Sequence, residues 1–114
     1  MEHQLDIIGD VAVIAIREEY IDASNSKEFR QAMSSLLEAH SKVIFDMSKV
    51  QFVDSSGCGA LLSCLRELNS RKGELKLCGI SKPVRGLFEL VRMHKIFDIL
   101  DSREQALSSF AVKV

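Results

Sequence analysis

The sequence predicts an open α/β fold, with a mostly parallel sheet of about five strands flanked by about four helices. The first observation is that short apolar runs alternate with segments whose apolar residues recur at helical spacing. Strands separated by helices pair in parallel through right-handed crossovers. The second is the length of 114 residues, which suits one domain with a real core and is too short for two. We therefore expect residues 1–114 to form one domain.

The chain is predicted to open with a hairpin of two antiparallel strands. Leu5 and Ile7 alternate with polar residues, and the apolar run of residues 11–16 follows. Between them, Gly9-Asp10 has the glycine-first pattern of a type II′ turn.

The first helix is expected after Asp22. Asn25 and Glu28 have the spacing of a capping box, and Ser24 is an alternative cap. One apolar stripe supports the helix, formed by Phe29, Met33, Leu36 and Leu37.

The middle of the chain continues the alternation. Residues 43–47 form a short apolar run typical of a buried strand. The second helix is expected over about residues 57–71, with Lys72-Gly73 as its stop signal. Residues 74–78 then alternate as the next strand. The helical spacing rests on Leu61, Leu62, Leu65 and Leu68.

The last part predicts two more helices around a short strand. Ser81 is expected to be the N-cap of the third helix, with Pro83 in its first turn. Residues 96–100 form the strand, and Ser102 and Gln105 have the spacing of a second capping box. The apolar faces of the two helices comprise Val84, Leu87, Phe88 and Val91 in the third, and Ala106, Leu107 and Phe110 in the fourth.

The segment Asp54-Ser55-Ser56-Gly57-Cys58-Gly59 falls where the apolar run ends and the second helical pattern begins, so we expect an exposed strand-to-helix loop. A phosphate added to a hydroxyl there would meet a helix N-terminus, which favours anions. Asp54 or Ser55 could simply be the N-cap. However, Gly57 and Gly59 each cost about 1 kcal/mol relative to Ala inside a helix. Their presence suggests that another surface approaches this backbone closely.

The sequence argues against catalysis at this segment. Neither serine has a glycine two residues before it, as the nucleophile elbow requires. A triad base would have to be His3, His40 or His94, none of which the sequence places beside Ser55, and all three are expected to be surface or partly satisfied residues. No P-loop pattern occurs. We therefore predict a phosphoryl acceptor rather than an enzyme, with no catalytic residue, no cofactor and no metal site.

Composition and charge narrow the class of partner, the cellular location and the state of the cysteines. Fifteen Lys plus Arg against 16 Asp plus Glu leave no basic excess for nucleic acid. The longest apolar run is far shorter than the ~20 residues of a membrane helix, and residues 1–4 do not look like a signal peptide, so a cytoplasmic location is expected. Cys58, Cys64 and Cys78 lack a C-x-x-C pair and are expected to be reduced, buried hydrophobes. Redox sensing by Cys58 is an alternative, since a nearby helix N-terminus would favour its thiolate.

Residues 50–62, Val-Gln-Phe-Val-Asp-Ser-Ser-Gly-Cys-Gly-Ala-Leu-Leu, resemble the signature of STAS domains, and more narrowly that of the single-domain anti-sigma factor antagonists of bacteria. The resemblance covers nearly the whole chain: a hairpin start, an Asp after the second strand, the D-S-S-G segment, and a Ser-Pro-type start of the third helix before Leu87-Phe88. Two positions depart from the pattern. Glu19-Tyr20 stands where Gly-Glu is usual, and Cys58 stands where leucine is common.

The resemblance implies a phosphorylatable switch in a partner-switching pathway that regulates transcription. Ser55 would be phosphorylated by a serine-kinase-type anti-sigma factor, which the unphosphorylated protein binds so that sigma is released. Phosphorylation would abolish binding, and a PP2C-type phosphatase would restore it. A STAS subunit of a transporter or of another signalling complex is the alternative, and a monomer without membrane insertion is expected. The residues implied to support the phosphosite or contact the partner are Asp22, Asp54, Ser56, Gly57, Cys58 and Gly59.

Overall fold

The computed structural model describes residues 1–110. A five-stranded sheet has the order β1-β2-β4-β6-β7, in which β1 is antiparallel to β2 and the other neighbours are parallel. This arrangement confirms the predicted open α/β sheet with four α-helices. The strands are β1 (His3–Ile8), β2 (Val11–Ile16), β4 (Lys42–Asp46), β6 (Glu74–Cys78) and β7 (Asp98–Leu100). The helices are α1 (Ser26–Ala39), α2 (Ser55–Ser70), α3 (Lys82–Leu90) and α4 (Arg103–Ser109). No helix among residues 1–110 is long and apolar enough to cross a membrane.

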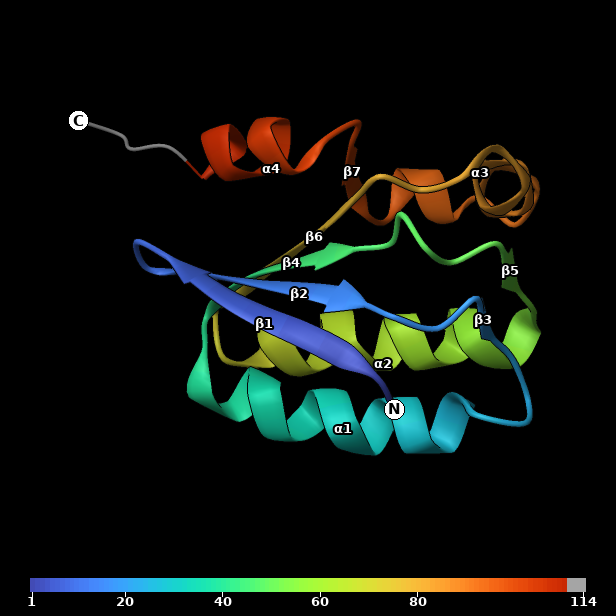
Figure 1. Ribbon diagram of the computed structural model, residues 1–114, viewed down its shortest axis with the longest axis horizontal. Helices are drawn as coiled ribbons and strands as arrows, with labels where there is room; N and C mark the ends of the chain where they lie inside the picture. The colour runs from blue at the N-terminus through green and yellow to red at the C-terminus, as the bar shows by residue number, and fades with distance from the viewer. Residues whose placement is uncertain (111–114) are drawn as a thin grey trace.

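Helices cover both faces of the sheet. Figure 1 shows α1 and α2 on one face and α4 on the other, while α3 lies at the end to which β2 and β4 point. The larger apolar cluster, between the sheet and α1 and α2, also takes in Val84 and Phe88 of α3. A smaller cluster lies under α4. Because successive strand residues face opposite sides, β6 supplies Leu77 to the first cluster and Cys78 to the second.

The N-terminal hairpin forms as predicted, with Ile8 opposite Val11 and the two-residue connection Gly9-Asp10 between them. Gly9 has a φ of +63°, and Asp10 is not among the residues with positive φ. This combination matches the type II′ turn, which needs a left-handed residue at its first central position only.

Two strands of two residues each were not predicted. Strand β3 (Tyr20–Ile21) pairs in parallel with β5 (Phe52–Val53). Two residues are too few to show an alternation, so the sequence carries no signal for them. They correct the position of Asp22, which follows β3 and not the second strand. Because Ile21 lies opposite Val53, the residues that follow the two strands, Asp22 and Asp54, leave this small sheet at the same level.

The predicted capping box at the start of α1 is wrong. Asn25 occupies the N-cap position, but its side chain makes no cap bond. Its amide instead accepts from the Asp22 backbone N–H at 2.9 Å and donates to the Tyr20 carbonyl at 2.9 Å. Ser24 does not cap the helix either, because its hydroxyl donates to the Asp22 carboxylate at 2.6 Å. The polar side chains therefore shape the turn between β3 and α1.

Helix α2 begins at Ser55, two residues earlier than predicted, and stops near the predicted signal. Lys72, not Gly73, takes the left-handed conformation, with a φ of +63°. The Gly73 N–H bonds to the Leu68 carbonyl at 2.7 Å and the Lys72 N–H to the Asn69 carbonyl at 3.1 Å, the pair of bonds that defines a Schellman motif. Gly73 is needed for another reason, since a Cβ there would lie 2.8 Å from the Ser41 carbonyl oxygen.

The caps of the last two helices agree with the sequence. The Ser81 hydroxyl accepts from Val84 N–H, and the Ser102 hydroxyl accepts from Gln105 N–H. The second capping box is incomplete, because Gln105 accepts from the N–H of Asp101, one residue before the cap.

Two expectations about the segment after α3 are wrong. Val91 caps the helix C-terminus and is 48% exposed rather than buried. The last strand is shorter than residues 96–100, because a 3₁₀ turn, η1 (Met93–Lys95), precedes it and leaves Ile96 54% exposed.

Polar contacts hold α4 against the sheet. Arg103 donates to Asp6 of β1 at 3.2 Å and to Asp46 of β4 at 2.9 Å. From β6, Lys76 is only 6% exposed, and its ammonium donates to the Ser109 hydroxyl at 2.7 Å. The same ammonium lies 4.4 Å from the centroid of the Phe110 ring. Charged side chains thus tie α4 to three strands.

Candidate functional site

Asp54 positions the candidate site by joining two segments. Its carboxylate accepts from Gly57 N–H at 2.9 Å through Oδ1, which caps α2. Its second oxygen, Oδ2, accepts from Ala23 N–H at 3.1 Å. The backbone N–H of Asp54 donates to the Ile21 carbonyl at 3.3 Å. One residue therefore starts the helix and fixes it to the turn after β3.

Ser55 and Ser56 lie in the first turn of α2, and both are exposed. The expectation of a loop at this segment is therefore wrong, because Asp54 allows the helix to begin at once. Neither serine caps the helix, since that place belongs to Asp54. The N–H groups of the first helical turn have no partner within a helix and carry partial positive charge. An anion on Ser55 would therefore lie at a position that favours it.

Asp22 lies in the turn beside this helix start. Its carboxylate accepts from the backbone N–H of Ser24 at 2.9 Å as well as from that residue's hydroxyl. The turn meets Asp54 through the neighbouring Ala23 N–H. The structure thus brings the predicted residues Asp22, Asp54, Ser55 and Ser56 to one end of the sheet, at the carboxyl ends of β3 and β5.

The two glycines of the segment have different environments. Gly57 is buried, and a Cβ there would lie 2.1 Å from the Ile21 carbonyl oxygen and 2.8 Å from Val53 Cγ1. The close approach that its sequence position suggested is therefore made within the chain, to the strand β3. Gly59 is exposed, and a Cβ there would meet nothing within 4 Å. Internal packing does not explain Gly59.

The position of Cys58 near a helix N-terminus would favour its thiolate, but its surroundings do not. Cys58 is 8% exposed, and burial together with the charge of Asp54 raises the pKa of its thiol. The thiolate is thus disfavoured, contrary to the redox alternative. All three cysteines are free and buried, as expected. Burial raises the pKa of Cys64 to about 12 and that of Cys78 to about 11.

An apolar groove of about 340 Å³ opens beside Ser55, between α2 and the segment of α3 and η1. Sequence reasoning missed it, because its walls come from residues more than 20 positions apart and the expected burial of Val91 concealed one of them. Its lining residues are Ser55, Cys58, Gly59 and Leu62 from α2, and Leu87, Val91, Met93 and Ile96 from the α3–η1 segment.

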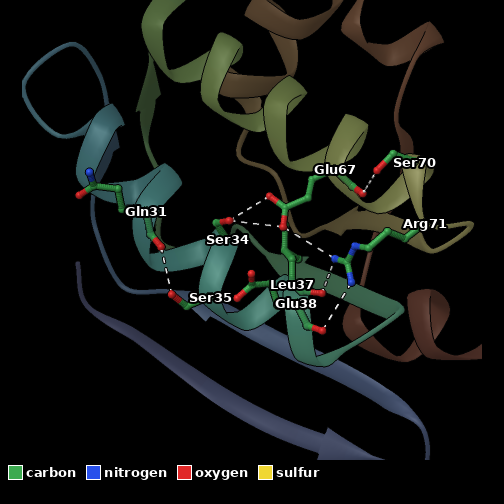
Figure 2. Close-up of polar contacts among 8 residues, drawn as sticks. All are labelled: Gln31, Ser34, Ser35, Leu37, Glu38, Glu67, Ser70 and Arg71. Carbon is green, nitrogen blue, oxygen red and sulfur yellow. Dashed lines mark hydrogen bonds and ion pairs between the residues drawn. The ribbon is translucent and has the colours of Figure 1, made fainter.

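A second cavity of about 330 Å³ lies between α1 and α2, and most of the residues that line it have polar or charged side chains. Ser34 and Glu67 line this cavity, and Figure 2 shows their contact: the Ser34 hydroxyl donates to Glu67 at 3.1 Å, and Arg71 lies 3.7 Å from the same carboxylate. The Arg71 guanidinium also donates to the carbonyls of Leu37 and Glu38, which satisfies the C-terminus of α1. These contacts lock α1 to α2. The cavity is lined by Lys27, Arg30, Gln31, Ser34, Ser63, Cys64 and Glu67.

The arrangement of residues 1–110 gives little support for a metal site or for acid–base catalysis. Three or more His, Cys, Asp or Glu side chains do not gather there as a metal ion would need. His3 is exposed in β1, His40 caps the C-terminus of α1, and His94 lies in η1. The groove next to Ser55 is lined by carbon-rich side chains and holds no histidine or carboxylate. It is suited to contact rather than to proton transfer.

Comparison with known proteins agrees with this picture. The family profile named "STAS domain" matches residues 2–106. The anti-sigma F factor antagonist of Paenibacillus polymyxa is 28% identical over 94 residues, which cover 81% of this chain and 80% of that protein.

Solved structures share the fold. The anti-sigma factor antagonist SpoIIAA in its unphosphorylated form is similar with a TM-score of 0.69 and 23% identity, covering 95% of this chain and 96% of that one. SpoIIAA of Bacillus in its phosphorylated form is similar with a TM-score of 0.71 and 24% identity, covering 96% of this chain and 100% of that one. The murine anion transporter Slc26a9 is similar with a TM-score of 0.69 and 25% identity. The match covers 88% of this chain but only 17% of the transporter.

Proposed function

This chain belongs to the STAS domain family, and from that membership we propose that it is a phosphorylatable anti-sigma factor antagonist. In its unphosphorylated form it binds a serine-kinase-type anti-sigma factor, so that the sigma factor is released. The kinase moves the γ-phosphoryl group of ATP to Ser55 Oγ, with release of ADP and the hydroxyl proton. A PP2C-type phosphatase reverses the step. The chain then acts as one STAS unit in the cytoplasm, as a monomer and as a substrate rather than an enzyme.

One observation carries the proposal: Ser55 is exposed in the first turn of α2, directly after the N-cap Asp54. The hydroxyl is open to a kinase, and the helix N-terminus, worth about +0.5 charge, favours the phosphate that results. Asp22 and Asp54 lie on the turns beside it, and both turns are shaped by their own hydrogen bonds. The name of the Paenibacillus relative and the phosphorylated form of SpoIIAA support the same role.

Electrostatics alone can account for such a switch. Phosphorylation adds about −1.5 to −2 charge. A carboxylate of the partner ~5 Å away would experience roughly 3 kcal/mol of repulsion per unit charge at an effective dielectric near 20. A cost of that size weakens binding by about a hundredfold. No rearrangement of the sheet or of α2 is required, so we propose a local effect of phosphorylation.

The alternative, a STAS subunit of a transporter, is supported by the similarity to part of Slc26a9. A sequence relative that covers 81% of this chain is named as an anti-sigma factor antagonist, which favours the first proposal. A gene for a kinase-like anti-sigma factor next to this one would favour the antagonist, and a transporter gene would favour the alternative.

Phosphorylation in vitro tests the assignment. The protein would be incubated with ATP and each purified kinase-type anti-sigma factor of the same genome, and the product mapped by tandem mass spectrometry. We expect one phosphate on Ser55, lost in Ser55→Ala and retained in the neighbouring control Ser56→Ala. Phosphate on Ser56 alone, or none with any of these kinases, would contradict the proposal.

A further inference from the structure

The apolar groove beside Ser55 has two walls with helical spacing. On α2, Ser55, Cys58, Gly59 and Leu62 follow one another at intervals of three, one and three residues and therefore share a face. On α3, Leu87 and Val91 are four residues apart and form the opposite wall. Ser55 lies at the end of the first wall, so the groove begins at the proposed phosphoacceptor.

Gly59 is the residue that keeps this groove open. A glycine inside a helix lowers helix stability relative to alanine. For Gly57 the close Ile21 carbonyl oxygen explains that cost, but a Cβ on Gly59 would meet no atom of the protein within 4 Å. Because Gly59 lines the groove, its missing side chain leaves space there that no atom of the protein fills. Gly59 is also one helical turn from Ser55, on the same side of α2.

Exposed apolar side chains gather at the end of the molecule that holds the groove. Among residues 1–110, eight large hydrophobic residues are exposed, and three of them lie on β1. Of the other five, two line the groove and the rest belong to α3, β3 and β5, at the end of the molecule where Figure 1 places these elements. Such a concentration of exposed apolar side chains indicates a contact surface. The five are Tyr20, Phe52, Leu90, Val91 and Ile96.

We propose that this groove receives an apolar side chain of the same kinase-type partner that phosphorylates Ser55, and that Gly59 admits it. The inference rests on the proposed function. A kinase that brings ATP to Ser55 Oγ has to lay its own surface against the rim of the groove, because Ser55 is part of that rim. An aliphatic or aromatic side chain suits the lining, which contains no charged residue. Binding and phosphorylation would then use adjoining parts of one surface.

The experiment fills the groove with a larger side chain and compares the result with the same substitution at a matched glycine outside the groove. Gly59→Leu places a side chain in the groove, and Gly86→Leu places the same side chain on α3, where a Cβ also meets nothing within 4 Å. Calorimetry would measure the dissociation constant of each variant for the ADP-loaded kinase that phosphorylates Ser55. We expect Gly59→Leu to bind at least tenfold more weakly than the wild type and Gly86→Leu to bind within twofold of it, with thermal midpoints no lower than that of the wild type.

A second pair of variants removes apolar surface instead of adding it. Ile96 lines the groove and is 54% exposed, while Ile7 lies on β1 and is 56% exposed. We expect Ile96→Ser to weaken binding severalfold and Ile7→Ser to leave it unchanged. This pair keeps the test valid even if Gly59→Leu were to lower the thermal midpoint.

The outcomes separate the two proposals. If the kinase phosphorylates Ser55 but binds Gly59→Leu and Ile96→Ser as tightly as the wild type, the groove inference is wrong and the proposed function stands. If no such kinase binds the wild type or phosphorylates Ser55, both are wrong. If light scattering shows that the wild type self-associates and Gly59→Leu does not, a second copy occupies the groove, which also overturns the inference.

Discussion

Replacing Asp54 by alanine tests whether one carboxylate holds the candidate site together. Its Oδ1 caps α2 through the Gly57 N–H at 2.9 Å, and its Oδ2 accepts from the Ala23 N–H at 3.1 Å. Asp54→Ala removes both bonds, whereas Asp54→Asn keeps one amide oxygen for the cap and presents an NH₂ group, which cannot accept, on its other side. The two variants therefore separate the cap from the link between the segments.

The expected magnitude follows from these two contacts. Loss of an N-cap costs about 1 kcal/mol. A hydrogen bond to a charged acceptor contributes about 1.5–3 kcal/mol when well sheltered, and we take about 1 kcal/mol because the bond to Ala23 is exposed. Asp54→Ala should then lose about 2 kcal/mol of the free energy of unfolding, which lowers the thermal midpoint by roughly 6–10 °C. Asp54→Asn should lose about half as much.

Thermal and urea denaturation followed by circular dichroism would measure these losses. Ser81→Ala is the matched control, because Ser81 caps α3 and its hydroxyl makes a single cap bond to Val84 N–H. It should cost about 1 kcal/mol. The reasoning would be refuted if Asp54→Ala were no more destabilising than Ser81→Ala, or if Asp54→Asn were as stable as the wild type. Either result would mean that the bond to Ala23 contributes nothing.

Further predictions concern the glycines, pH and the thiols. Gly57→Ala should lose more than about 3 kcal/mol, because a Cβ would lie 2.1 Å from the Ile21 carbonyl oxygen, while Gly59→Ala should gain up to about 1 kcal/mol; equal effects in urea melts would contradict this. Burial alone would raise the pKa of Asp46, but its hydrogen bonds to Arg103 and to the next turn hold that pKa below its usual value. Asp46→Asn should therefore be less stable than the wild type at pH 7, and the difference should shrink as pH falls below about 4; a gap that does not change with pH would refute the assignment. The three cysteines should react with a thiol reagent at pH 8 far more slowly than in denaturant, and fast labelling of Cys58 would revive its redox role.

Where the sequence predicted elements correctly, local chemistry and structure agree. The hairpin at Gly9, the strand at residues 74–78 and the caps Ser81 and Ser102 each depend on neighbours within a few positions. Such signals survive folding because no distant residue competes for the same groups.

The predictions that were wrong concern groups whose partners or surroundings the local sequence pattern does not show. Asn25 was expected to cap α1, but it bonds to Asp22 and Tyr20, which belong to the preceding turn and strand. The pairing of β3 with β5 joins segments about 30 residues apart, and no pattern in two residues can reveal it. The environment that raises the pKa of Cys58 likewise includes burial that a motif does not show.

The candidate site contains one residue that the sequence identifies and one surface that it does not. Ser55 was identified from the motif and its place before a helical pattern, and it is exposed as expected. The groove beside it depends on Val91 and Ile96, whose exposure follows from where α3 ends and η1 begins. A hydrophobic pattern alone predicts such residues to be buried, so the surface that a partner meets could only be found from the fold.

The way α4 is attached has a consequence for local unfolding. Its apolar contacts form the smaller cluster, and much of its anchorage comes from Lys76 and Arg103. Acid or high salt weakens the ion pairs of Arg103 with Asp6 and Asp46, which join α4 to the sheet, and leaves the larger core untouched. The helix should therefore open as a separate unit, with amide protons that exchange before those of α2. Each opening uncovers Cys78 but not Cys64, which makes Cys78 a built-in reporter of this motion, at the face of the sheet away from α1 and α2.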